Sequence, residues 1–249
     1  MKLGRKPRGH DSRIPKVSAL RSRQSLAPLP PAVSYASGLP SNLGAMGNDS
    51  IGDCTCAAAG HAIQVWSWNA GHTLITPPDL DVLELYETCS GYVPGDPATD
   101  TGCIAQGVLH HWLRYPLAGN TLYGYAEIDT ADFADIQRSI WECGVVYLGF
   151  NVPSYLMNKL TAPGSVWDVE TADTGIVGGH CVDAIGYDEN GNLTIVSWGA
   201  TYTMTPAFWA AYVDESYALV DQDWCNITGK TPLGLALPDL DHAMHELKA

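Results

Sequence analysis

Cys54 is the residue of this sequence that most directly suggests chemistry. It follows a turn-rich loop, 47–53, and precedes a run of small residues whose pattern predicts a helix over 55–69. A thiol in the first turn of a helix lies at the positive end of the helix dipole, which lowers its pKa and favours the nucleophilic thiolate. Asp53 is the predicted N-cap, although its charge would oppose that thiolate. Cys54 is therefore a candidate nucleophile; the alternative is a half-buried cysteine that packs as a small apolar residue.

His180 is the candidate base that such a nucleophile requires. It begins a predicted strand, 180–187, and the pair Asn190-Gly191 predicts a tight turn into a second strand, 193–198. The chain has eight histidines, so a cysteine and a histidine in one sequence do not by themselves define a site. The choice of His180 depends on the residues that flank it.

A zinc site is an alternative chemistry, because Cys54, Cys56 and His61 lie close together in the sequence. On a helix, however, about two turns, or roughly 10 Å, separate Cys54 from His61, which is too far for both to bind one ion. Packing in the core is the expected role of Cys56. We therefore expect neither a metal nor a cofactor.

The elements that must position these residues change character along the chain. Helical patterns come first, and strands dominate the second half, where a buried strand over 145–150 and the hairpin that begins at His180 are predicted. This order predicts an α+β fold with two lobes and a cleft between them. Further helices are expected over 76–88, 105–114 and 130–143, from 205, and near 239–247, with a closing strand over 217–220. The expected units are an extended basic arm, 1–28, a mainly helical lobe, 29–125, a mainly β lobe, 126–228, and a tail, 229–249.

Charge is distributed very unevenly over the 249 residues. Residues 1–23 carry eight basic residues against Asp11 alone, a net charge of +7, and the rest of the chain carries −21. A body of that charge repels nucleic acid, whereas the arm could bind nucleic acid, or an acidic surface on a partner or on another copy of the chain. Two alternatives for the arm remain open: a disordered tail, and a short propeptide that lies in an acidic cleft.

The sequence contains neither a long apolar span nor the apolar core of a secretory signal. We therefore expect a protein that crosses no membrane and stays in the cytoplasm or associates with a particle. Seven cysteines are an odd number, so at least one thiol cannot pair within the chain, and mostly free thiols are expected.

Four segments, in one order, resemble the papain-like cysteine peptidases over residues 29–220. Gly52-Asp53-Cys54 is similar to the approach to the catalytic cysteine, and the Cys-Thr-x-Ala form is closest to bacterial members. Thr101-Gly102-Cys103 is similar to the segment that lines the substrate cleft. The segment 179–187, which contains His180, resembles the one that bears the catalytic histidine, and Ser197-Trp198-Gly199 resembles the segment after the third triad residue.

The resemblance implies a papain-like fold in which Cys54 and His180 are catalytic. It also implies an oxyanion hole made by the Cys54 N–H and the side-chain amide of Asn48. Trp198 would pack near His180 and shield it from water, or serve simply as a core tryptophan. Substrate contacts are implied for Gly102, Cys103, Gly179 and Trp198.

Three positions depart from the family pattern. Asn48 replaces a glutamine and is one methylene shorter, Val196 replaces the asparagine that orients the histidine, and Ala105-Gln106 replaces a Gly-Gly pair that binds substrate backbone. The leading interpretation is a peptidase or amide hydrolase that works through a Cys54–His180 dyad and an acyl-enzyme on a peptide or protein substrate. The alternative is a catalytically impaired papain-like domain that serves as a structural or binding module, for example in a viral particle, docked by its basic arm.

Overall fold

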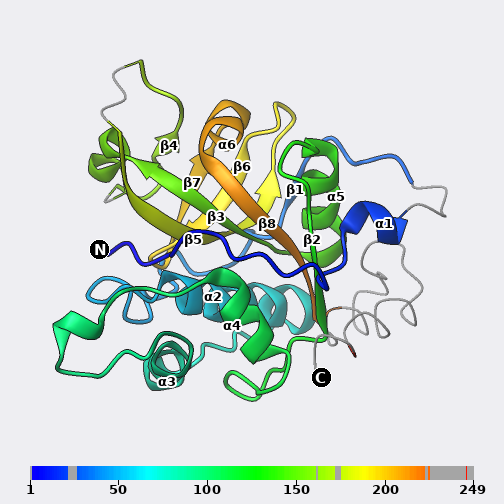
Figure 1. The fold of residues 1–249 in the computed structure, drawn as a ribbon. Coiled ribbons are helices and arrows are strands. Elements are labelled where there is room, and N and C mark those ends of the chain that lie inside the picture. The colour runs from blue at the N-terminus through cyan, green and yellow to red at the C-terminus, as the bar shows by residue number, and fades with distance from the viewer. Residues whose placement is uncertain are drawn as a thin grey trace.

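The protein has two layers, and the N-terminal arm runs between them along their boundary (Figure 1). The computed structural model describes residues 2–21, 27–160, 162–171, 175–221, 224 and 245. In Figure 1 a curved sheet lies above the arm, and three helices of the other lobe lie below it. The helices are α1 (Val17–Arg21), α2 (Cys54–Gly71), α3 (Asp79–Ser90), α4 (Ala105–Trp112), α5 (Phe133–Cys143) and α6 (Pro206–Tyr212), with single 3-10 turns η1 (Pro97–Thr99) and η2 (Ser154–Asn158).

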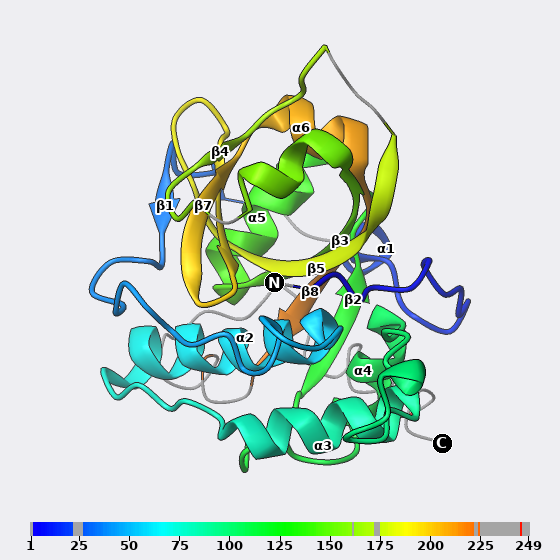
Figure 2. The same ribbon diagram turned by 90° about the vertical axis from the view of Figure 1, so that its left-hand side faces the viewer.

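The sheet has eight strands and is antiparallel except where β4 pairs with β7. Its order is β2-β8-β3-β5-β6-β7-β4, and β1 pairs with β5 outside this path. The sheet curls around α5, while α2 packs against β5 from the other lobe (Figure 2). The predicted α+β, two-lobe class is confirmed. The strands are β1 (Val33–Ser34), β2 (Gly124–Glu127), β3 (Val146–Pro153), β4 (Val166–Trp167), β5 (Ile176–Tyr187), β6 (Leu193–Ser197), β7 (Ala200–Met204) and β8 (Val213–Val220).

Helix α2 is the central element of the helical lobe. Its first thirteen residues are all buried, and small side chains allow the close approach: a Cβ added at Gly60 would lie 2.3 Å from the sulfur of Met46. The sequence pattern of α3 predicts a buried stripe of Leu80, Leu83 and Tyr86, and only Tyr86 of these is buried. Val82, Leu85 and Tyr86 are buried, whereas Leu80, expected in the buried stripe, is 70% exposed because it lies in the first turn, on the solvent side.

The hairpin and the later helices follow their local signals. β5 and β6 pair antiparallel around the Asn190-Gly191 turn, where Asp188 accepts hydrogen bonds from the N–H groups of Asn190 and Asn192. Helix α5 is capped by Asp132, which accepts from the N–H of Asp135, and so begins later than the predicted cap at Thr130.

The arm is attached to the body at several points along its length. Residues 2–8 lie between the two lobes (Figures 1 and 2), and farther on Ile14 and Val17 are buried in the core. Within the segment predicted to be extended, Val17–Arg21 form the short helix α1, which the burial of Val17 anchors. Nearly all of the predicted tail, 229–249, including the helix near 239–247, lies outside the described residues.

No helix among the described residues combines the length and the apolar character that a membrane span requires.

Candidate active site

Cys54 is the first residue of α2, and its side chain is buried. Its thiol receives backbone hydrogen bonds from Cys181, the residue after His180, and from Gly4 of the arm. Burial raises the pKa of Cys54 to about 12, and these backbone hydrogen bonds oppose the shift without cancelling it. The predicted low thiol pKa is therefore wrong for this arrangement, because exclusion of water outweighs the helix dipole.

Asp53 precedes the helix in the N-cap position but does not cap it. Its φ of −97° and ψ of 19° lie outside the extended region that capping requires, and its side chain accepts no cap hydrogen bond. Burial raises the pKa of Asp53 to about 8, so its carboxyl group is mostly protonated at neutral pH. The charge expected to oppose a Cys54 thiolate is therefore largely absent.

His180 is buried in β5, and only one of its two ring nitrogens has a hydrogen-bond partner among the described residues. Nε2 is 2.8 Å from Oγ of Ser197, and Nδ1 has no hydrogen-bond partner among the described residues. Burial, together with the smaller effect of the positive charge of Arg5, lowers the pKa of His180 to about 3. The imidazole of His180 is therefore neutral. The backbone amide of the next residue, Cys181, is the one that contacts the Cys54 thiol.

Trp198 covers the imidazole ring. The two rings stack with centroids 4.2 Å apart and an interplanar angle of 13°, and the indole Nε1 donates to the Asn48 carbonyl at 3.1 Å. Trp198 adopts a φ of 45°, a left-handed conformation that costs a bulky residue on the order of 1–3 kcal/mol. This strained turn, directly after Ser197, places the indole over His180 and links it to the loop that carries Asn48.

Ser197 is the residue behind the imidazole, whereas the resemblance to the family places the orienting triad position at Val196, which cannot make that contact. Val196 is fully buried and pairs with Asp183 across the β5–β6 ladder, so it packs in the sheet. Ser197, one position later, carries the hydroxyl that contacts Nε2. Ser197 belongs to the Ser-Trp-Gly segment already noted in the sequence. Neighbouring residues of a strand face opposite sides of the sheet, so only one of Val196 and Ser197 can reach the ring of His180.

Asn48 lies in the loop before α2 and exchanges hydrogen bonds with the arm. Its side-chain amide donates to the carbonyl of Lys2 at 3.2 Å and to that of Ile51 at 3.1 Å, and its own carbonyl accepts from the N–H of Lys2 at 3.0 Å. The amide therefore already binds a peptide carbonyl, despite the shorter side chain.

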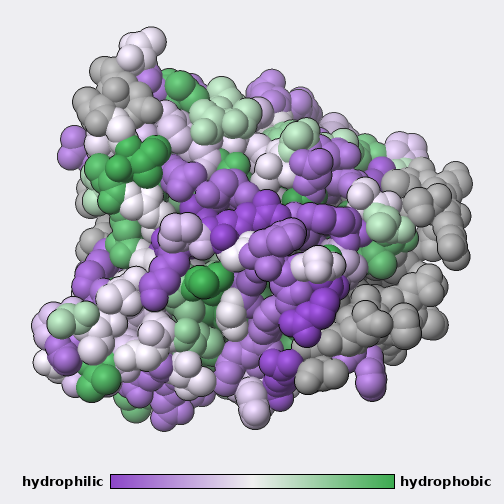
Figure 3. Space-filling model, in the orientation of Figure 1, coloured by the Kyte–Doolittle hydropathy of each residue, from purple (hydrophilic) through white to green (hydrophobic). Residues whose placement is uncertain are grey.

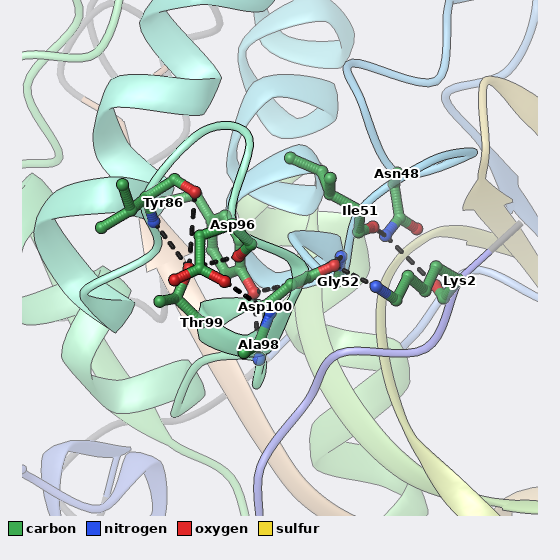
Figure 4. Close-up of polar contacts among 11 residues, drawn as sticks. Lys2, Asn48, Ile51, Gly52, Tyr86, Asp96, Ala98, Thr99 and Asp100 are labelled. Carbon is green, nitrogen blue, oxygen red and sulfur yellow. Dashed lines mark hydrogen bonds and ion pairs between the residues drawn. The ribbon is translucent and has the colours of Figure 1, made fainter.

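Asp100 is a site residue that sequence analysis did not single out. Its carboxylate accepts from the N–H of Gly52 at 3.0 Å and from the hydroxyl of Tyr86 at 2.6 Å, and it pairs with Lys2 (Figure 4). Burial alone would raise the pKa of Asp100, but these donors outweigh it and leave the pKa low. Asp100 thus joins the loop before Cys54, helix α3 and the arm at one carboxylate.

Residues 2–8 of the arm, here called the cleft segment, pair with backbone on both lobes. Cys103 N–H donates to the Gly4 carbonyl at 2.8 Å, Lys6 N–H donates to the Cys103 carbonyl at 2.9 Å, and Arg5 N–H donates to the Gly179 carbonyl at 3.0 Å. Gly102 has a φ of 78°, and a Cβ there would lie 2.0 Å from the Gly4 oxygen. Three residues implied as substrate contacts, Gly102, Cys103 and Gly179, therefore line the track that the cleft segment occupies.

Ala105 and Gln106, expected to replace a backbone-binding pair, lie instead in the first turn of α4 and are buried. Cys103, two residues earlier, makes both backbone hydrogen bonds to the cleft segment. The backbone hydrogen bonds from this segment to residues 4 and 6 of the arm therefore come from Cys103 and do not involve residues 105–106.

Basic side chains of the arm pair with carboxylates of the same chain. Arg5 meets Glu215 and Asp214, while Arg8 and Lys16 both meet Glu127. Hydrophilic residues accordingly form a band across the middle of the face that the arm crosses (Figure 3). The acidic surface expected for the arm is thus present in the chain itself.

Comparison with solved structures identifies the fold. Xylellain, a cysteine protease from Xylella fastidiosa, matches 88% of this chain and 96% of its own with a TM-score of 0.66 and 17% identity. The fold is papain-like. Procathepsin B S9 from Trypanosoma congolense matches 88% of this chain and 86% of its own (TM-score 0.61, 12% identity), and bromelain from Ananas comosus matches 78% and 100% (TM-score 0.56, 12% identity). The sequence matches no protein-family model and no curated protein.

The papain-like fold accounts for the two lobes and confirms the resemblance found in the sequence segments. At these identities the likeness concerns the fold, and the catalytic roles of Cys54, His180 and Asn48 stay predictions. No group of three or more His, Cys, Asp or Glu side chains in the described part of the chain is arranged to hold a metal ion. His61, once weighed as a ligand, is buried in α2 and contacts Gln64 through Nδ1 at 2.9 Å.

Proposed function

We propose that this papain-like chain is a cysteine peptidase that acts through a Cys54–His180 dyad, and that its own cleft segment holds it inactive. The observation that carries the proposal is the state of His180. The imidazole is buried, Ser197 holds its Nε2, and its ring stacks on Trp198. Its Nδ1 has no hydrogen-bond partner among the described residues. The backbone amide after it contacts the Cys54 thiol. Ser197 supplies the orienting contact that Val196 cannot.

In the proposed reaction the thiol of Cys54 gives its proton to Nδ1 of His180, and the sulfur bonds to the carbonyl carbon of the substrate. The Cys54 N–H and the Asn48 amide donate to the resulting oxyanion. The carbon–nitrogen bond then breaks, and His180 gives the proton to the leaving amine. A water molecule, deprotonated by His180, adds to the thioester and releases the carboxylic acid and the Cys54 thiol.

The cleft segment opposes this reaction in two ways. It places the backbone of Gly4 against the thiol as a hydrogen-bond donor, while the Gly4 carbonyl is turned to the N–H of Cys103. The peptide unit at the thiol therefore does not present its carbonyl carbon for attack. The buried thiol, with a pKa of about 12, and the imidazole, with a pKa of about 3, also disfavour transfer of the proton from Cys54 to His180 while the segment is docked.

The test compares full-length proteins in a peptide-library cleavage assay. Gly4→Ala, which forces the cleft segment away from Cys54, should cleave peptides, and Gly4→Ala with Cys54→Ala should not. Cys56→Ala in the Gly4→Ala background is the matched control, because Cys56 is a buried cysteine of the same helix outside the site. Absence of cleavage in all variants, together with no labelling of Cys54 by a thiol-reactive epoxide, would reject the peptidase and favour a binding module.

A further inference from the structure

The carboxyl group of Asp53, the residue before Cys54, has no part in the reaction proposed above. The residue is fully buried, and neither carboxyl oxygen has a hydrogen-bond partner among the described residues. Only its backbone carbonyl serves the helix, by accepting from the N–H groups of Cys56 at 2.7 Å and Ala57 at 3.0 Å. A buried polar group without a partner destabilises a fold, so stability does not explain this side chain.

The loop before α2 encloses that carboxyl group. Gly47 has a φ of 93°, a left-handed conformation that glycine adopts readily, and a Cβ there would lie 2.8 Å from Oδ2 of Asp53. The Gly47 carbonyl accepts from the N–H groups of Ser50 at 2.9 Å and Ile51 at 3.0 Å, which folds the loop back on itself. The carboxyl group therefore occupies the space that a side chain at residue 47 would need.

The side-chain amide of Asn48 lies beside the same carboxyl group. Burial raises the pKa of Asp53, and the Asn48 amide opposes the rise, although the two groups form no regular hydrogen bond. While the cleft segment is docked, the amide donates to the carbonyls of Lys2 and Ile51 (Figure 4). A side-chain amide has two N–H hydrogens, so both are in use and neither is left for Asp53.

Departure of the cleft segment frees one of these two hydrogens, because the Lys2 carbonyl leaves with it. The freed N–H of Asn48 is the donor that the proposed oxyanion requires. Asp53 is the competing acceptor, and it competes strongly only as a carboxylate, since hydrogen bonds to an ionised group are roughly twice as strong as those between neutral groups. The protonation state of Asp53 therefore decides whether the amide is available.

Charged side chains act on Asp53 from the loop and from the end of η1. Asp49 and Asp100 both disfavour a further negative charge and so raise the pKa of Asp53. Lys2 pairs with Asp100 while the cleft segment is docked, and it leaves with that segment. Undocking therefore removes a positive charge from this neighbourhood and favours the neutral form of Asp53 further.

The thiols of Cys54 and Cys56 act on Asp53 from α2. The charge of Asp53 raises the pKa of both thiols, so each of them, when ionised, repels a carboxylate at residue 53 in turn. Burial is the largest cause, and together with the carboxylate charges it raises the pKa of Asp53 to about 8. Asp53 is therefore mostly neutral at about pH 7 and mostly ionised above about pH 9.

We propose that Asp53 is a positioning residue for the oxyanion hole: as a neutral carboxyl group it leaves the Asn48 amide free to bind the oxyanion, and as a carboxylate it binds that amide and withdraws it. This inference rests on the proposed peptidase function and adds to it a residue that touches neither the substrate nor the thiol.

The first test is a pH profile of cleavage by full-length Gly4→Ala protein. Between about pH 7 and 9.5, kcat should fall about 10- to 30-fold with little change in KM, because about 3% of Asp53 is still neutral at the upper pH and the ionised form lacks an oxyanion donor. Asp53→Asn, which stays uncharged, should remove that fall. Asp49→Asn is the matched control, since Asp49 is a neighbouring but exposed carboxylate, and it should keep the fall. Any fall that comes from His180 or Cys54 is common to all three proteins.

The second test needs no cleavage. In full-length Gly4→Ala, Cys54→Ala protein, the NMR signals of the Asn48 side-chain amide, assigned by their loss in Asn48→Ser, should shift in one step centred near pH 8. The step should be absent when Asp53→Asn is added. Asp53→Ser is a second uncharged variant that should also lack the step, and it replaces Asp53→Asn if that protein does not fold.

A missing step, or a step that persists without the Asp53 carboxyl group, would overturn the inference. So would a fall in kcat that is equal in Gly4→Ala and in its Asp53→Asn variant. A step that depends on Asp53, found without cleavage by any Cys54-containing variant, would instead reject the peptidase function and leave the contact between Asp53 and Asn48 established.

Discussion

Adding one methyl group at Gly4 should expose the Cys54 thiol. A Cβ on Gly4 would lie 1.8 Å from the oxygen and 2.2 Å from the carbonyl carbon of Gly52, and both are backbone atoms that cannot turn aside. The Gly4 oxygen already occupies the space that a Cβ at residue 102 would fill, so the backbone of Gly102 also packs closely against Gly4 and leaves little room for a local shift. Gly4→Ala must therefore lift the cleft segment off Cys54.

The energetic consequence can be worked out from the hydrogen bonds nearby. A shift of about 1.5 Å, enough to bring that Cβ to an ordinary contact distance, stretches bonds of 2.8–3.2 Å beyond hydrogen-bonding range. Four are affected: two between Lys2 and Asn48, one between Cys103 and Gly4, and one between Arg5 and Gly179. At about 0.5–1.5 kcal/mol each, their loss weakens docking of the cleft segment by roughly 2–6 kcal/mol.

The effect on Cys54 is a rise in its rate of alkylation. A fall in the thiol pKa from about 12 to an ordinary value near 8.5 raises the thiolate fraction at about pH 7.5 by roughly 3,000-fold. The lower-pKa thiolate is intrinsically less nucleophilic by about 40-fold, so a net increase of about 70-fold is expected before any gain from access. The assay is iodoacetamide labelling of full-length protein, with Cys54 followed by peptide mass spectrometry.

Gly9→Ala is the control for this experiment, since it adds the same methyl group to the same arm. A Cβ there would meet Oε1 of Gln106 at 2.8 Å and Cγ2 of Ile104 at 3.2 Å, both ends of movable side chains, so the cleft segment should stay docked. The reasoning is refuted if Gly4→Ala and Gly9→Ala label Cys54 at the wild-type rate while both melt as folded proteins.

Three further outcomes are expected. Ser197→Ala in the Gly4→Ala background should lower kcat about 3- to 10-fold by removing the Nε2 contact, with Ser197→Thr restoring it; equal rates would show that Ser197 does not orient His180. Asp100→Asn should raise Cys54 labelling only a few-fold, because it breaks an ion pair with a lysine that is 42% exposed, and a rise as large as that of Gly4→Ala would contradict this ranking. Docking of the arm should be tightest between about pH 6.5 and 8.5. Below that window freed His180 gains a proton that the docked form excludes down to about pH 3, and above it freed Cys54 loses a proton that the docked form keeps up to about pH 12. The anisotropy of a dye at the N-terminus measures docking, and a flat response from pH 5 to 9.5 would refute the linkage.

Much of the fold could be predicted because its signals are local. The small residues after Cys54, the alternation before Asn190-Gly191 and the Thr205-Pro206 start of α6 each act within a few residues, and the structure places α2, the β5–β6 hairpin and α6 there. The buried face of α3 could not be predicted in the same way. Which stripe of an amphipathic helix faces inward depends on its packing partners, and Leu80 lies on the solvent side.

The candidate site shows the same division between local and distant causes. Cys54 and His180 could be found from their own flanks, whereas the pKa of Cys54 depends on burial beneath the arm, which no local pattern reports. Asp100 and Arg5 were missed because their partners are distant in sequence: Asp100 binds Lys2, and Arg5 binds Glu215, 210 residues later. The opposite charges of arm and body predicted attraction, but charge counts carry no information on which carboxylate a given cation reaches.

The ion pairs between the basic arm and the acidic body give a reason for the uneven distribution of charge along the chain. Asp100, Glu127, Asp214 and Glu215 each have a cation of the arm as a counter-ion. The pairs at Asp100 and Glu127 involve half-exposed lysine or arginine side chains and are screened by salt, whereas the pair at Glu215 is buried and is screened far less. Rising salt should therefore loosen the ends of the cleft segment before it loosens Arg5. A peptide that competes for the cleft must therefore displace the Arg5 contact in particular.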